Sequence, residues 1–174
     1  MMHERQRQEF LGAAAEMFDR LHVWRAQHPE ASFDEIAAEV TPQRRQLMGL
    51  LLCCLATQHG DGRYATLACP TCHMPMKSSG LRKRQVVHPE GDVLLKRSYH
   101  YCPFCASGLF SLDQQLKITS LRMTPATIDA ALTVRDLIDS YRLAAEQFTA
   151  LTHVYVSKSS LQRIANSLDG ESVA

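Results

Sequence analysis

Cys69-Pro70-Thr71-Cys72 and Cys102-Pro103-Phe104-Cys105 are two copies of one C-P-x-C step, separated by the segment 73–101. Two residues between the cysteines allow both sulfurs of a pair to point to one place from a tight turn. Two such turns supply the four thiolates that a structural zinc ion takes in a tetrahedral site. Four cysteine ligands fill the coordination sphere and leave no position open for a substrate. The predicted ligands of one structural zinc ion are therefore Cys69, Cys72, Cys102 and Cys105.

Two disulfides, or one redox pair of the C-x-x-C type, are the alternative interpretations of these cysteines. A redox pair usually opens a helix within a β-α-β pattern, which neither copy does here. Segment 1–8 is charged and lacks the apolar core of a signal peptide. The apolar run 47–56 is too short to cross a bilayer, and its Cys53 and Cys54 are predicted core residues. We expect a cytoplasmic, nucleoid-associated protein without membrane contact, in a reducing compartment where clustered cysteines favour metal over disulfides.

Between the two cysteine pairs the sequence changes to strand and turn signals. The runs 81–88 and 92–101 flank His88-Pro89-Glu90-Gly91, which suits a tight turn. Alternation in the second run places Val93, Leu95, Tyr99 and Tyr101 on one face and Leu94, Lys96, Ser98 and His100 on the other. The sequence therefore predicts a zinc ribbon over 63–118, in which a β-hairpin links the two cysteine turns.

The charge of the chain is unevenly distributed. The 174 residues carry a net charge of only +1. The segment 77–101, however, holds six basic residues opposed only by Glu90 and Asp92. This surplus is consistent with a nucleic-acid surface, and a solvated hairpin face is the equally weighted alternative. The predicted phosphate contacts are Arg82, Lys83, Arg84, Lys96 and Arg97.

The first third of the chain has the apolar spacing of helices. One helix is expected over 4–27, with a stripe formed by Phe10, Ala14, Met17, Leu21 and Trp24. The capping box from Ser32 to Glu35 predicts a short helix through Val40, and Thr41-Pro42 predicts the start of another that ends near Gln58. These elements form a predicted helical unit over 1–62, and the stripe is expected in core packing or in a homodimer.

The last third predicts helices over 125–137, 141–152 and 158–168, within a helix-turn-helix module at 119–174. In the final helix Leu161, Ile164, Ala165 and Leu168 point inward. Gln and Asn side chains pair with adenine, Arg pairs with guanine, and Lys and Ser bind phosphates. The outward residues predicted to contact DNA are Lys158, Ser159, Gln162, Arg163 and Asn166, although any amphipathic surface helix shows a similar pattern.

These segments predict an α+β fold that is mainly α, made of an N-terminal helical unit, a central four-cysteine zinc ribbon and a C-terminal helix-turn-helix. Hydrophobic residues make up 45% of the chain and charged residues 21%, as in ordinary soluble globular proteins. A closed four-cysteine site gives no reason to expect an enzyme.

The order of these pieces resembles the N-terminal region of bacterial insertion-sequence transposases of the Kra group, members of the DDE superfamily. The stretches that carry the resemblance are CPTC at 69–72, YCPFCASGLFSLD at 101–113, MTP at 123–125, YRLAAEQFT at 141–149, VSKSSLQR at 156–163 and WRAQHP at 24–29. The resemblance covers nearly the whole chain. The second cysteine turn with its Gly-Leu-Phe and Asp is the more specific part, and the helix-turn-helix match is looser.

The resemblance implies that the ribbon and the helix-turn-helix recognise double-stranded DNA at transposon ends. In the family a downstream RNase H-like domain cuts and joins DNA with three metal-binding carboxylates. The present sequence reaches Ala174 without such a domain, so we expect DNA binding without cleavage, by a truncated or domesticated relative or by a piece of a longer protein. The alternative is an adaptor or inhibitor that docks on a transposase or another nucleic-acid complex through the ribbon.

Overall fold

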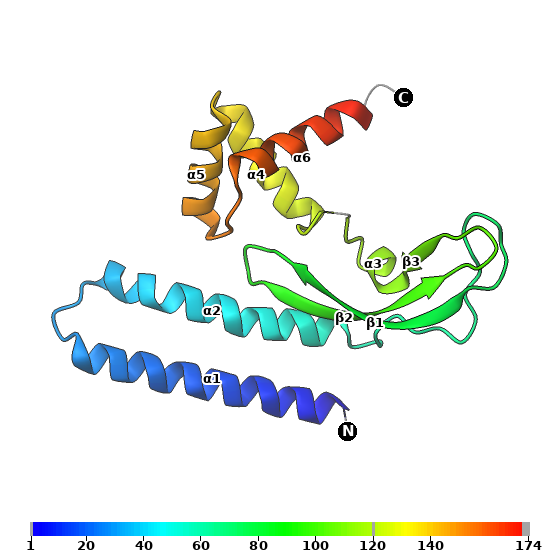
Figure 1. Ribbon diagram of the computed structural model, residues 1–174. Coiled ribbons are helices and arrows are strands. Elements are labelled where there is room, and N and C mark those ends of the chain that lie inside the picture. Colours follow the sequence, from blue (N-terminus) through cyan, green and yellow to red (C-terminus); the bar gives the residue numbers. More distant parts are fainter. Residues whose placement is uncertain (1, 120, 172–174) are drawn as a thin grey trace. The chain divides into compact units, whose positions relative to one another are not determined.

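The computed structural model describes residues 2–119 and 121–171, in which the chain forms six helices and a three-stranded antiparallel sheet (Figure 1). The fold is thus mixed α+β and mainly helical, as predicted. The chain divides into two compact units, one made of 1–86 with 90–116 and the other of 87–89 with 117–174. The predicted boundary between 118 and 119 lies close to this division, whereas the predicted boundary after 62 falls inside the first unit.

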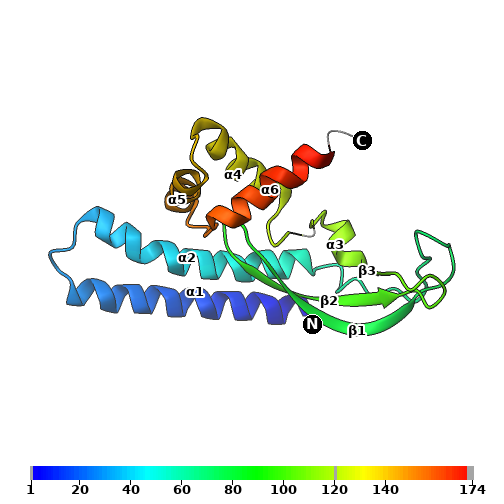
Figure 2. The ribbon, with the colours of Figure 1, turned by 45° about the horizontal axis from the view of Figure 1, so that its top comes forward.

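The first unit begins with an antiparallel helical hairpin of α1 (Met2–Gln27) and α2 (Phe33–Ala56), which lie side by side in Figures 1 and 2. The predicted stripe on α1 is half-buried along its whole length. Arg20 Nε donates a hydrogen bond of 3.4 Å to Gln43 Oε1, which adds a polar contact between the helices. The stripe therefore takes part in packing within one chain, as the first of its two predicted roles requires.

The two helices predicted around residue 41 are one continuous helix, and the predicted break was wrong. Ser32 caps α2 with a complete capping box, in which its backbone N–H donates to Glu35 Oε2 over 2.7 Å. Pro42 lies inside the helix and removes one backbone donor, while the Thr41 hydroxyl donates to the Ala37 carbonyl over 2.8 Å. A proline in a helix interior costs about 3 kcal/mol. Packing of α2 on α1 along both halves offsets this cost.

The sheet has the order β1-β2-β3, with β1 at Lys77–Val86, β2 at Val93–Tyr101 and β3 at Gly108–Phe110. β1 and β2 form the predicted hairpin, and their register shifts once between Ser78 and Leu81. Gly80 lies in this irregularity with φ +81°, a conformation that glycine adopts without strain. After β3 the chain turns into the short helix α3 (Ser111–Gln115).

The predicted alternation of β2 holds only in its first half. Val93 and Leu95 are buried and Leu94 and Lys96 are exposed, as expected. In the second half Ser98 and His100, predicted to share a face with Leu94 and Lys96, are 0% and 1% exposed. The Ser98 N–H donates to the Asp61 carbonyl over 2.9 Å, because the loop after α2 packs against this end of the strand. A covering loop distant in sequence therefore overrides the period-two pattern.

The hairpin turn packs directly on α2 through two glycines. A Cβ atom on Gly49 would lie 2.3 Å from the Asp92 carbonyl oxygen, and one on Gly91 would lie 2.5 Å from the Gly49 nitrogen. Two ion pairs flank this approach: Arg44 to Glu90 at 3.0 Å and Arg45 to Asp92 at 2.8 Å. The helical hairpin and the ribbon therefore form one body.

The second unit contains α4 (Pro125–Leu137), α5 (Tyr141–Thr152) and α6 (Lys158–Glu171), close to the predicted bounds. The Thr124 and Ser140 side chains cap α4 and α5, and Ser157 Oγ accepts from the Ser160 N–H at the start of α6. Residue Val87 also belongs here, because its N–H donates to the Arg122 carbonyl over 2.6 Å. Buried side chains of this core include Phe148, Leu161, Val154, Ile128, Ile164 and Val156.

Candidate functional site: a four-cysteine cluster and two exposed polar surfaces

The two cysteine turns have the same backbone geometry. In each turn the first cysteine N–H donates to the carbonyl five positions later, from Cys69 to Met74 over 2.9 Å and from Cys102 to Ser107 over 2.8 Å. The residue directly after each second cysteine is left-handed, with φ 59° at His73 and 55° at Ala106. The repeated C-P-x-C sequence therefore folds into two equivalent loops that present their sulfurs to a common point.

The four sulfurs lie within 4.8 Å of one another and could hold one metal ion. Three separations are 3.5 Å for Cys69–Cys105, 3.4 Å for Cys72–Cys102 and 3.7 Å for Cys72–Cys105. A tetrahedral site with metal–sulfur bonds of about 2.3 Å requires sulfur separations of about 3.8 Å. All six cysteines of the chain are free thiols, so neither disulfide of the alternative interpretation is formed.

A hydroxyl group next to the cluster favours the thiolate form. Ser107 Oγ lies 3.4 Å from the Cys69 sulfur and 3.0 Å from the Cys105 sulfur. The hydrogen bond from Ser107 lowers the pKa of Cys69 to about 5, and it also lowers the pKa of Cys105. At Cys72 the Met74 backbone favours the thiolate, but the Cys102 thiol and burial outweigh it and raise the pKa to about 12. Sequence reasoning missed Ser107, although its place two residues after Cys105 was a usable signal.

The cluster is partly shielded from solvent. Cys69 and Cys102 are fully buried, packed with Met76, while Cys105 is exposed. Among the described residues, the group of side chains able to hold a metal consists of the four cysteines alone. His100 is nearby in sequence and buried, yet it is not part of this group, and neither of its ring nitrogens has a hydrogen-bond partner in the described structure.

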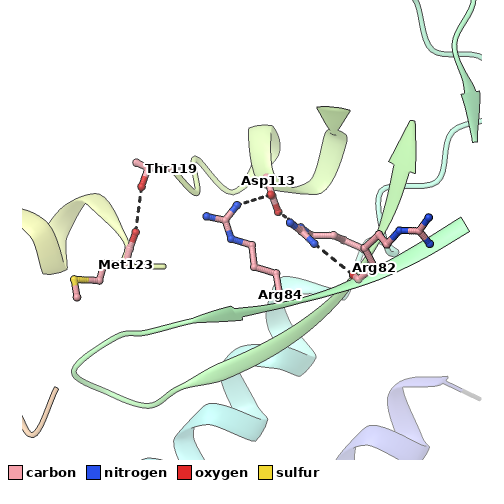
Figure 3. Close-up of polar contacts among 6 residues, drawn as sticks. Arg82, Arg84, Asp113, Thr119 and Met123 are labelled. Carbon is pink, nitrogen blue, oxygen red and sulfur yellow. Dashed lines mark hydrogen bonds and ion pairs between the residues drawn. The ribbon is translucent and has the colours of Figure 1, made fainter. Parts of the chain in front are cut away.

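Two of the five predicted phosphate contacts on the hairpin are engaged by the protein itself. Arg84 Nη1 lies 2.8 Å from Asp113 Oδ2, and Arg97 Nε lies 2.5 Å from Asp113 Oδ1. Figure 3 shows the Arg84 and Asp113 side chains pointing toward one another. The Arg97 guanidinium also stacks 3.6 Å from the centre of the Phe110 ring.

Arg97 is only 5% exposed, so its predicted role as a phosphate contact is replaced by a structural one. Arg84 is half-buried against the same carboxylate and is not counted among the exposed cations. The signal that could have indicated this arrangement was Asp113 itself, an acidic residue in the stretch that follows the second cysteine turn. Its partners lie on strands far from it in sequence, so the pairing could not be read from local spacing.

The other three predicted hairpin contacts are exposed. Arg82, Lys83 and Lys96 all carry exposed side chains, and Lys83 lies directly opposite Lys96 in the β1–β2 pairing. Arg82 donates to the carbonyl of its neighbour Leu81 over 3.2 Å. These three side chains are therefore the exposed ones among the five predicted hairpin contacts.

The predicted polar face of α6 is also exposed. Leu161, Ile164 and Ala165 are buried, whereas the five residues predicted to face outward all reach solvent, namely Lys158, Ser159, Gln162, Arg163 and Asn166. The side chain of Leu168, predicted to point inward, lies outside the described residues. The link from α5 to α6 turns at His153, whose φ is 56°, and buries Val154 and Val156. The second unit therefore presents α6 with one packed face and one free polar face.

No family model, curated protein or solved structure matches this chain. In the described residues, helices long and apolar enough to span a bilayer are absent.

Proposed function

We propose that this protein binds double-stranded DNA without cleaving it, with one zinc ion at the four cysteines holding the ribbon. The proposal extends the resemblance to the DNA-recognising region of Kra-group transposases, and transposon ends or a promoter site are the expected targets. The single observation that carries it is the free face of α6. A helix that packs on α4 and α5 through apolar residues leaves its Lys, Gln, Arg and Asn side chains exposed to solvent on one face, and Arg163 also donates to the Ser160 hydroxyl over 3.4 Å.

The arrangement of α5 and α6 suits the major groove. The groove admits one α-helix, and sequence is read there by side chains that form paired hydrogen bonds with base edges. Gln162, Arg163 and Asn166 are of the types that make these contacts, and Lys158 and Ser159 at the start of the helix suit phosphates. We assign base reading to the first three residues and positioning on the backbone to the last two.

Zinc is the metal that this ligand set favours in our proposal. Four thiolates in a tetrahedron select zinc or iron, and zinc has no geometric demand of its own. The ion would supply no open coordination position, so its contribution is to fold the two turns and fix the strands that leave them. The Ser107 hydroxyl would orient and stabilise the Cys69 and Cys105 thiolates in this site.

A binding selection from random duplex DNA, made with the zinc-loaded full chain, tests the proposal. We expect one enriched motif, and we expect Arg163→Ala to reduce preference for that motif by about 1–3 kcal/mol, or roughly fivefold to 150-fold. Arg122→Ala is the matched control, because Arg122 is an exposed arginine of the same unit outside α6. A selection without enrichment, or an Arg163→Ala variant with unchanged preference, would contradict the assignment of α6.

A further inference from the structure

Two neighbouring rungs of the β1–β2 hairpin place a cation opposite a cation. Arg82 pairs with Arg97, and Lys83 pairs with Lys96. Like charges directly opposite in an antiparallel pair destabilise it, because their side chains lie only about 5 Å apart at Cβ. A hairpin selected for stability alone would not place four cations in this way, so each rung needs a compensating anion.

The chain supplies that anion for one rung only. Asp113 accepts from Arg97, and the Arg97 guanidinium stacks on Phe110 and bonds the Arg82 carbonyl over 3.4 Å. The Lys83–Lys96 rung lies on the opposite face of the hairpin, since facing residues alternate along a strand. Among the described residues, ion pairs to a carboxylate are absent for both lysines, and both side chains are exposed.

The surroundings of the lysine rung are open to a large partner. Of its neighbours on the same face, Leu81, Gln85 and Leu94 are exposed, whereas Ser98, opposite Leu81, is buried under the loop after α2. At this position the hairpin is two-stranded, because β3 pairs only with the segment Tyr99–Tyr101 of β2. The rung therefore projects two flexible cations from a ridge that a second macromolecule can approach.

We propose that Lys83 and Lys96 form a two-point contact to the phosphate backbone of duplex DNA. This inference rests on the proposed function and adds a division of labour to it. The lysine rung supplies affinity that is independent of base sequence and falls with salt, whereas α6 supplies the preference for sequence. The repulsion between Lys83 and Lys96 lowers the stability of the free protein, and a bound phosphate removes this repulsion.

The first test compares the salt dependence of affinity for a short duplex of arbitrary sequence. We expect the double variant Lys83→Gln/Lys96→Gln to reduce the slope of log Kd against log salt by about 2, because each phosphate contact contributes about 0.9. The double variant Arg5→Gln/Arg7→Gln is the matched control, since it removes the same charge from exposed sites on α1. Equal slopes for the two double variants would overturn the rung assignment.

The second test uses one substitution whose two effects have opposite signs. Lys83→Glu places a carboxylate opposite Lys96, so the zinc-loaded protein is expected to melt at a higher temperature while its affinity for the duplex falls. A misfolded variant cannot give this combination, because its melting temperature would fall. A Lys83→Glu variant with wild-type affinity would overturn the inference. If the wild-type chain itself fails to bind any duplex at low salt, the proposed function fails, whatever these variants do.

Discussion

At the scale of single residues, the protonation of the cluster decides how tightly it takes a metal. With a pKa of about 5, Cys69 is a thiolate at pH 7, whereas Cys72, with a pKa of about 12, keeps its proton. Metal binding must displace that proton, so the affinity rises with pH. We expect at least a tenfold gain per pH unit between pH 6 and 8, measured by competition with a chelator. An affinity independent of pH would show that Cys72 is not a ligand.

Ser107 provides a second prediction at this scale. Ser107→Ala removes the hydroxyl that lowers the pKa of Cys69 and Cys105, so both thiols hold protons to higher pH. We expect a weaker metal affinity, with the largest loss near pH 6 and a smaller one at pH 8. Ser79→Ala, an exposed serine on β1 outside the cluster, is the control and should bind metal as the wild type does. The same chelator competition measures both variants, and a parallel loss in both would count against the role of the hydroxyl.

At the scale of elements, the contact between α2 and the hairpin turn depends on glycine. Gly49→Ala places a methyl group 2.3 Å from the Asp92 carbonyl oxygen, which forces the turn away from the helix. We expect a loss of about 1–3 kcal/mol in the free energy of unfolding. The control is Gly12→Ala, because Gly12 lies within α1 with no atom within 4 Å of its added Cβ. That substitution should instead stabilise by about 1 kcal/mol, and urea unfolding of the two variants tests the contrast.

The elements also show which parts of the fold the sequence could predict. The bounds of α4 and α5, the capping box of α2 and the hairpin follow from signals within a few residues, and the cluster of four cysteines follows from the spacing of the two C-P-x-C steps. The continuity of α2 across Pro42, the burial of Ser98 and His100 and the pairing of Arg97 with Asp113 depend on residues far away in the chain. Packing against α1, a covering loop and a distant carboxylate decide these three features. None of them leaves a local pattern.

At the scale of the whole molecule, the two units are stabilised by different means. In the first unit, the buried Cys69 and Cys102 of the cysteine cluster form a small core with Met76. Two largely buried ion pairs, from Arg84 and Arg97 to Asp113, add to it. The second unit has an apolar core built around Phe148 and Leu161, with its own capped helices. Binding of a structural metal is coupled to folding, so only the first unit is expected to depend on the ion.

We therefore expect removal of the metal to unfold one unit and spare the other. In hydrogen exchange, chelation should expose backbone amides near the cysteine turns, such as Cys102, and leave those of Phe148 and Leu161 protected. Cys69→Ser should reproduce the effect without a chelator, while Cys54→Ser, which alters a cysteine outside the cluster, should keep both metal and protection. Because the lysine rung lies on the strands that the cluster holds, the chelated protein should lose salt-dependent DNA affinity and retain the base preference of α6. Simultaneous loss of protection in both units would show instead that the chain folds as one cooperative body around the metal.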